Sequence, residues 1–368
     1  MIQDDYYLLN KMLEDMEKAH LFFKPTNYWQ VYQNKLLPII KREGIARFRA
    51  SDCKIFSSFG VSQIPKTLTR QWLHDKQADF SLVDRITRAL LRKNSFFIRS
   101  QKQHMETLQA FRNACFYFVL QGDKDKQILS IADSGYGDPQ DLFSPLPSNN
   151  NKYTLSFLRY FHQLQWVRQF VDFSSIRSML ELGCGYGGQI EVIKKLYPNI
   201  KLVLCDIPPQ LYVSEQYLKQ VFPNEVTGYL ETSRMDKIDL THAKPITIIA
   251  TWDLKKIIAP VDLFWSSTTF QEMEPVVVEN YLNIIQSLET SFIYLLQSIK
   301  GKRVATKPGE MGVLEQTILE HYIQYLPNHL LTQQENAVFF ASAVDGKQYI
   351  TSYDVYHMLF QKRSSLML

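Results

Sequence analysis

The sequence predicts an α/β protein in which a doubly wound, mostly parallel sheet follows a mostly helical N-terminal domain. The main observation is a stretch with a buried strand at residues 179–182, a glycine-rich turn, a helix, and a second strand that ends at Asp206. Short apolar runs at residues 246–250 and 292–296 are typical of buried parallel strands. Two further apolar runs, residues 337–341 and 356–360, flank an Asp-Gly turn and predict an antiparallel C-terminal hairpin that closes the sheet.

The N-terminal part of the chain is predicted to be helical. In residues 4–23, apolar side chains recur at alternating spacings of three and four, which indicates a helix with one packing face. That face packs either on the protein's own body or against a second copy of the chain in a homodimer. A second helix is expected to begin at Thr26 or Asn27, and to be interrupted or ended by Pro38. Residues 66–120 again favour helix.

A boundary between two domains is predicted near residue 150. Residues 133–152 are rich in Gly, Pro, Ser and Asn, and the hydrophobic periodicity disappears there. Residues 1–150 are therefore assigned to a helical domain that covers the substrate or mediates oligomerisation. Residues 151–368 are assigned to a ligand-binding α/β domain.

The glycine turn after the first strand indicates a ligand site. Gly183, Gly185 and Gly188 lack a Cβ, so the backbone can adopt positive φ and approach a ligand closely. Asp206, about 20 residues further on, is placed to accept hydrogen bonds from a ribose diol. The expected ligand therefore contains an adenosine-like ribose.

The residue before this turn helps to choose between two cofactors. The same glycines satisfy the G-x-G-x-x-G pattern of dinucleotide-binding proteins, so an oxidoreductase is one alternative. Glu181, two residues before Gly183, suits a cationic ligand better than a pyrophosphate at a helix N-terminus. S-adenosylmethionine, with its ammonium and sulfonium groups, is such a ligand, and we favour it.

Other side chains at strand ends are candidates for contact with the cofactor. Trp252 and Asp253 follow the strand at residues 246–250, where they can stack on an adenine and accept from its amino group. Asp253 can instead cap the turn that follows it. Ser266 and Ser267 are expected to open a polar turn after the strand at residues 262–265, where a second substrate should meet the cofactor.

The segment after that polar turn supplies the candidate catalytic residues. Glu272 is the first candidate for a general base, with Gln271 orienting the substrate, although Glu272 can instead hold the turn or cap the next helix. His242 is a second candidate base. A basic segment follows the strand at residues 292–296 and forms either a solvated loop or a lid whose cations meet phosphates. Its cationic residues are Lys300, Lys302, Arg303 and Lys307.

Several of these motifs also resemble a known family. Glu181-Leu-Gly-Cys-Gly-Tyr-Gly-Gly, Leu204-Cys-Asp-Ile-Pro, Asp262-Leu-Phe and Phe270-Gln-Glu-Met are similar, in order and spacing, to those of the sugar O-methyltransferases. These are class I S-adenosylmethionine-dependent methyltransferases. The N-terminal Lys24-Pro-Thr-Asn-Tyr-Trp resembles the helical leader of that family. One departure is that the family tends to have Asn and Ser where this chain has Ser266 and Thr269.

The resemblance implies both a fold and an activity. The fold is the Rossmann-like sheet of class I methyltransferases, with S-adenosylmethionine bound by the glycine turn and by Tyr186 and Ile207 beside it. Tyr153, in the helix before the first strand, either borders the cofactor or supports the fold. The activity is transfer of a methyl group to a hydroxyl of a sugar or a glycosylated small molecule. A non-sugar small-molecule acceptor, or a catalytically silent cofactor-binding scaffold, is the alternative.

Composition argues against several other kinds of function. The net charge is +4 with 21% charged residues, and no block of like charge favours nucleic-acid binding. No run approaches the roughly 18 apolar residues of a membrane span, and the first residues do not resemble a signal peptide. The four cysteines have no metal-binding spacing, so a reducing, cytoplasmic setting is expected. A divalent metal that assists the transfer is an open alternative, but the sequence does not support it, because Asp262 opens a strand, away from Glu272 and Glu274.

Overall fold

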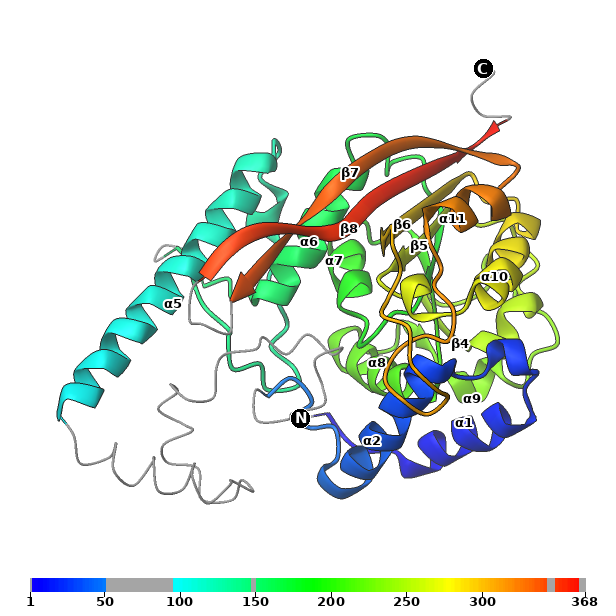
Figure 1. Cartoon of the computed structure of the whole chain (residues 1–368), viewed down its shortest axis with the longest axis horizontal. Helices are drawn as coiled ribbons and strands as arrows, with labels where there is room; N and C mark the ends of the chain where they lie inside the picture. Colours follow the sequence, from blue (N-terminus) through cyan, green and yellow to red (C-terminus); the bar gives the residue numbers. More distant parts are fainter. Residues whose placement is uncertain (1, 51–94, 147–149, 343–347, 364–368) are drawn as a thin grey trace.

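The computed structural model describes residues 2–50, 95–146, 150–342 and 348–363 (Figure 1). Its centre is an eight-stranded sheet with the order β3-β4-β2-β1-β5-β6-β8-β7. The parallel strands are β1 (Ser178–Leu182), β2 (Lys201–Asp206), β3 (Val226–Thr227), β4 (Ile246–Ala250), β5 (Leu263–Ser267) and β6 (Phe292–Ser298). The hairpin of β7 (His329–Ser342) and β8 (Gln348–Lys362) adds to β6 in antiparallel pairing.

The order of the strands identifies the fold. The chain steps outward from β1 through β2 and β4, and then returns to the other side of β1 through β5 and β6. With the two-residue β3 set aside, this order and the antiparallel edge are those of the class I methyltransferase fold. The predicted doubly wound sheet with a C-terminal hairpin is therefore confirmed. A crevice for ligands is expected between β1 and β5, where the direction of winding reverses.

One predicted boundary in this sheet is wrong. Ser266 and Ser267 do not open a turn, because β5 continues through both residues in register with β6. Ser266 is fully buried, and its carbonyl accepts a hydrogen bond from Nε2 of Gln297 at 3.1 Å. Pairing with the neighbouring strand satisfies their backbone groups, which outweighs the turn preference of two consecutive serines.

Successive residues of each strand point to opposite faces, so each face has its own core. Met179 of β1 packs in one core with α6 (Leu155–Val167), α7 (Gly188–Leu196) and α8 (Pro208–Val221). Leu180 packs in the other with η5 (Thr251–Lys256), α10 (Pro275–Ser287) and α11 (Leu319–Tyr325). Cys115, Cys184 and Cys205 are buried without disulfides.

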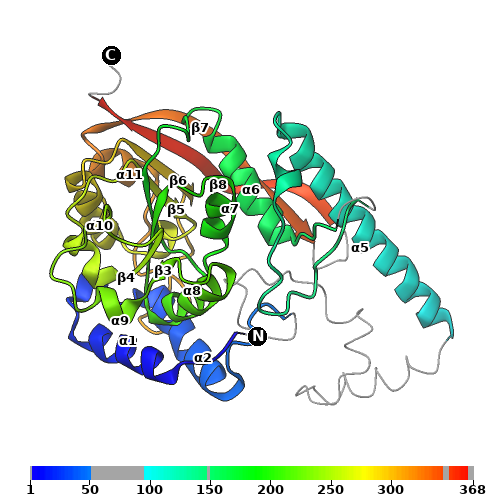
Figure 2. The same cartoon turned by 180° about the vertical axis from the view of Figure 1, so that it is seen from behind.

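The N-terminal helices lie in two different places (Figures 1 and 2). Helices α1 (Tyr6–Lys18) and α2 (Asn27–Glu43) are joined through η1 (Leu21–Phe23) and pack beside α8, with α1 also against α9 (Tyr229–Thr232). Helix α5 (Ser95–Gly122) leads through η4 (Gln127–Ser130) to α6, against which it packs. The assignment of residues 1–150 to one domain stays a prediction.

The seam of α1 packs on the protein's own body. Leu9 and Met16 are buried, whereas Tyr6 at the helix start is 42% exposed. A homodimer through these helices remains a prediction. The expectation that Pro38 interrupts or ends the second helix is wrong, because α2 continues to Glu43 and ends at Gly44, whose φ is 68°. Burial of Leu36 and Ile40 on either side of the proline offsets its lost hydrogen bond.

Some predictions lie outside the part of the chain that the structure describes. They include the helical pattern of residues 66–94 and the position of Cys53. In the described ranges, no helix has both the length and the apolar character needed to span a bilayer.

Candidate active site

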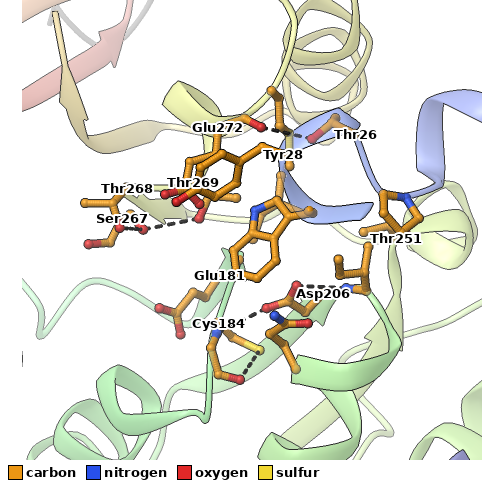
Figure 3. Close-up of a pocket in the computed structure, with 18 of the residues that line it drawn as sticks. Thr26, Tyr28, Glu181, Cys184, Asp206, Thr251, Ser267, Thr268, Thr269 and Glu272 are labelled. Atoms are coloured by element: carbon orange, nitrogen blue, oxygen red, sulfur yellow. Dashed lines mark hydrogen bonds between the residues drawn. The ribbon is translucent and has the colours of Figure 1, made fainter. Parts of the chain in front are cut away.

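A cavity of about 360 Å³ lies at the carboxyl ends of the parallel strands, where the fold predicts a ligand crevice (Figure 3). Its lining comes from α2, α6, the glycine turn after β1, the ends of β2, β4 and β5, and the segment after β6. We divide this lining into two parts. The floor consists of Glu181, residues 183–185 and Asp206. The roof consists of Tyr28, Trp29, Tyr32, Glu272 and Lys302.

The glycine turn in the floor requires glycine on steric grounds. Gly183 has φ 81°, and a Cβ at this position would lie 1.9 Å from Oγ1 of Thr269. Larger residues are therefore excluded where the turn after β1 touches the turn after β5. Thr268, in that second turn, has φ 59°, which is uncommon for a β-branched residue and is the kind of backbone strain found at functional sites.

Asp206 at the end of β2 is held by the backbone of the floor. Its two carboxylate oxygens accept hydrogen bonds from the amide of Gly185 at 3.1 Å and the amide of Ile207 at 2.8 Å. Burial nevertheless raises the pKa of Asp206 to about 7, against the lowering effect of these hydrogen bonds. A carboxylate fixed in this way has lone pairs left to accept hydroxyl groups of a ribose.

Glu181 is the acid of the floor whose hydrogen bonding is incomplete. It is 3% exposed, and burial together with the nearby charge of Asp206 raises its pKa well above the usual value. Its buried Oε2 has no hydrogen-bond partner among the described residues. A buried carboxylate oxygen without a partner is costly unless a ligand supplies a donor or a positive charge.

These features fit S-adenosylmethionine. The ammonium of its methionine end can supply the missing donor to Glu181, and Asp206 is placed for its ribose. The turn at Gly183 leaves room for close approach of the ligand to the backbone. The floor therefore has the groups that the cofactor requires.

The roof presents a second carboxylate among aromatic rings. Burial raises the pKa of Glu272 to about 7, while Lys302 and the side chains of Trp29 and Tyr28 oppose that rise. The Lys302 Nζ lies 3.2 Å from Oε1 of Glu272 and 5.7 Å from the centre of the Tyr28 ring. Tyr32 packs on Tyr28 and on Trp29, with ring centres 5.3 Å apart in both pairs. In Figure 3, Glu272 and Tyr28 lie across the cavity from Glu181 and Asp206.

Thr26 and Asn27, at the start of α2, form hydrogen bonds that hold the segments of the roof against one another. Thr26 Oγ1 donates to the carbonyl of Glu272 at 2.9 Å. The Asn27 amide donates to the carbonyls of Glu310 at 2.9 Å and Gly312 at 2.8 Å, and it accepts from the amide of Gly309 at 2.8 Å. Asn27 thus holds the segment after β6, which carries Lys302, against α2.

Of the twelve residues predicted for cofactor binding, six line this cavity and six do not. Those that line it are Glu181, Gly183, Gly185, Asp206, Ile207 and Ser267. Tyr186 and Gly188 lie behind the turn, where the Tyr186 ring stacks under the Arg49 guanidinium at 5.0 Å. Tyr153 is 1% exposed and donates to the carbonyl of Ile128. Ser266 is buried within β5.

Trp252 and Asp253 face a different hollow, which α1 and α9 also line. Asp253 makes an ion pair with Lys256 at 2.8 Å, within η5. The side chain that reaches the cavity from this strand end is instead Thr251. The structure therefore places Thr251, rather than Trp252 or Asp253, in the cavity lining.

Of the three predicted catalytic residues, Glu272 lines the cavity, and Gln271 and His242 do not. Glu272 lines the cavity, whereas the Gln271 side chain turns away and accepts from the amide of Ser298 at 2.5 Å. His242 is exposed and precedes β4, so it lies toward the amino end of the strands, opposite the cavity. Among the described residues, no group of three or more His, Cys, Asp or Glu is arranged to hold a metal ion.

Sequence reasoning did not assign several lining residues to the site. On α2 these are Tyr28, Trp29 and Tyr32, and on α6 they are Arg159, Tyr160 and Gln163. The resemblance of residues 24–29 to a family leader was the only signal for the first group. Nothing in the pattern of α6 distinguishes the second group from an ordinary half-buried helix face.

Comparison with known proteins agrees with this geometry. Residues 159–243 match the sequence model of a family described as the O-methyltransferase domain. These residues include β1, the glycine turn and Asp206. Among curated proteins, no sequence is significantly similar to the chain.

Several solved structures are similar to the chain in part. The mitomycin 7-O-methyltransferase MmcR is 12% identical, with 56% of each chain covered and a TM-score of 0.36. The pyocyanin biosynthetic protein PhzM is 11% identical, with 53% of each chain covered and a TM-score of 0.33. A magnesium protoporphyrin IX methyltransferase from Synechocystis PCC 6803, solved with bound S-adenosylmethionine, is 10% identical, with 55% of this chain and 79% of that chain covered and a TM-score of 0.34. This chain therefore spans just over half the length of the first two.

The sheet topology, the chemistry of the floor and the match to an O-methyltransferase domain support the same conclusion. Residues 159–243 are similar to an O-methyltransferase domain, and the floor has the groups that S-adenosylmethionine requires.

Proposed function

We propose that the protein transfers the methyl group of S-adenosylmethionine to a hydroxyl of a sugar or a glycosylated small molecule. The observation that carries this proposal is the roof, where Glu272 stands among Tyr28, Trp29 and Tyr32. Aromatic rings beside polar side chains suit the apolar and hydroxyl-bearing faces of a sugar ring. Ser267, Thr268 and Thr269 add hydroxyl groups at the junction of roof and floor.

Glu272 has the properties of a general base for this reaction. The bound cofactor supplies an electrophilic methyl group, and an acceptor hydroxyl must lose its proton as it attacks. A base with a pKa near the working pH is well matched to that task, and the pKa of Glu272 is about 7. The ordered roof aligns the acceptor, and such alignment can contribute roughly 7–11 kcal/mol to lowering the barrier.

The test is a methyl-transfer screen with radiolabelled S-adenosylmethionine. The acceptors are nucleotide sugars, free glycans and non-sugar phenols and alcohols, each with Mg²⁺ and with a chelator. We expect transfer to a sugar hydroxyl in the presence of the chelator. Transfer to non-sugar hydroxyls alone would refute the sugar acceptor. Cofactor binding without transfer to any acceptor would favour the scaffold alternative.

A further inference from the structure

The charged side chains of the cavity are unevenly distributed between the floor and the rest of the lining. The lining contains the acids Glu181, Asp206 and Glu272 and the cations Lys24, Arg159 and Lys302. Glu181 and Asp206 belong to the floor and would serve the cofactor, which itself brings a net positive charge. The remaining lining then has three cations against the one carboxylate of Glu272, and of these Lys24 donates to the carbonyl of Glu17 at 2.7 Å.

Lys302 is the cation closest to the proposed chemistry. Its ammonium lies 3.2 Å from the Glu272 carboxyl, so it is within reach of any group next to a hydroxyl that Glu272 deprotonates. Its side chain is 36% exposed, which leaves it free to turn toward a ligand.

The other cations of the same segment do not share this position. Lys300 pairs with Asp354 at 3.3 Å, and Lys307 lies 3.7 Å from Glu310. Neither lines the cavity, and neither does Arg303.

We infer that the acceptor carries an anionic group, a carboxylate or a phosphate, near the hydroxyl that is methylated, and that Lys302 binds this group. The inference rests on the proposed function, since it concerns the acceptor of that reaction. An anion balances the excess positive charge of the lining outside the floor. It also draws the ammonium away from Glu272, so that the carboxylate is free to accept the hydroxyl proton when a correct acceptor is bound.

The experiment measures binding of simple probes to the protein saturated with S-adenosylhomocysteine. The probes are glucuronate, glucose 6-phosphate and the neutral glucose, and the readout is tryptophan fluorescence. Trp29 lies in the cavity wall, so the variant Trp29→Phe shows which part of the signal arises there. We expect one anionic probe to bind at least about tenfold more tightly than glucose, as a charge-assisted hydrogen bond allows. Which of the two anions binds separates carboxylate from phosphate.

The variants decide whether Lys302 causes the preference. Lys302→Met should reduce the preference for the anionic probe over glucose to less than about threefold. Lys302→Arg, which keeps the positive charge, should retain most of that preference. Lys300→Met is the matched control and should leave it unchanged, because Lys300 lies outside the cavity. Equal binding of all three probes, or a preference that survives Lys302→Met, would overturn the inference. Because this assay needs no methyl transfer, its result is independent of the acceptor screen.

Discussion

The floor and the roof of the cavity are built in opposite ways. The floor comes from one short stretch, in which the end of β1, the glycine turn and the end of β2 lie within residues 181–206. The roof joins α2 to segments near the other end of the chain, and the hydrogen bond from Asn27 to Glu310 spans 283 positions. The acids of the floor, Glu181 and Asp206, are buried, whereas the aromatic residues of the roof are only half-buried.

This difference separates two tasks of a methyltransferase. The floor meets a cofactor that does not vary, and a rigid local structure is suited to it. In the proposed function the roof meets the acceptor, and a surface assembled from several segments can change its specificity without disturbing the floor. Substitutions in the floor should therefore affect cofactor affinity, and substitutions in the roof should affect turnover and acceptor binding.

The largest effect is expected from Glu272→Gln in the roof. The amide cannot accept the hydroxyl proton, so kcat should fall by about 10²–10⁴-fold. Affinity for S-adenosylhomocysteine, measured by calorimetry, should stay the same. The control is Glu279→Gln at an exposed position on α10, which should leave both kcat and the affinity for S-adenosylhomocysteine unchanged. Unchanged turnover in Glu272→Gln would show that this residue only supports the turn.

Asp206→Asn tests the floor. An amide has a single oxygen acceptor, so the hydrogen bonds to ribose and to the amides of Gly185 and Ile207 can no longer all form. We expect cofactor affinity to weaken by about 10–100-fold, with a smaller effect on kcat at saturating cofactor. Asp253→Asn is the matched control, because Asp253 lies outside the cavity. If calorimetry showed that Asp253→Asn weakens cofactor binding and Asp206→Asn does not, Asp253 rather than Asp206 would be the residue that binds the cofactor.

A pH profile distinguishes the roof from the floor in the unmodified enzyme. With a pKa of about 7, the ionised fraction of Glu272 rises as pH rises through 7. At saturating cofactor, kcat/KM for the acceptor should therefore rise about tenfold between pH 6 and pH 8. Lys302 lowers this pKa, so in Lys302→Met the rise should move to higher pH. A flat profile would contradict the role of Glu272 as the base.

The smallest effect is expected from Asn27→Ala. Three hydrogen bonds between α2 and residues 309–312 are lost, each worth about 1 kcal/mol net, but the segment retains its other contacts. KM for the acceptor should rise severalfold while cofactor affinity is unchanged. Steady-state kinetics with an altered KM for S-adenosylmethionine and a normal one for the acceptor would show that roof and floor are not separable in this way.

The same contrast explains what could be predicted from the sequence. Every strand of the parallel sheet except the two-residue β3 was predicted, because buried strands produce continuous apolar runs. Gly183, Glu181 and Asp206 could be placed together at one site because a turn, a charge and a strand end follow one another within one local unit, and all three line the cavity. Ser266 was misplaced because strand pairing, which is not local, decides where β5 ends.

The roof could not be predicted in the same way. Tyr28, Trp29 and Arg159 belong to helices whose patterns indicate packing and do not reveal which strand ends they face. Trp252 and Asp253 met the local criterion of a strand end, but the short helix η5 carries both away from the cavity. Such outcomes depend on contacts between distant segments, which a single sequence does not display.

The hydrogen bonds of Asn27 also have a consequence for folding. Ring closure between distant segments costs more entropy than local pairing, so contacts across 283 positions form late. During synthesis, α2 leaves the ribosome long before residues 309–312 exist. The floor can therefore form while the roof is still open, and a chain interrupted before residue 300 would lack both Lys302 and the segment that Asn27 binds.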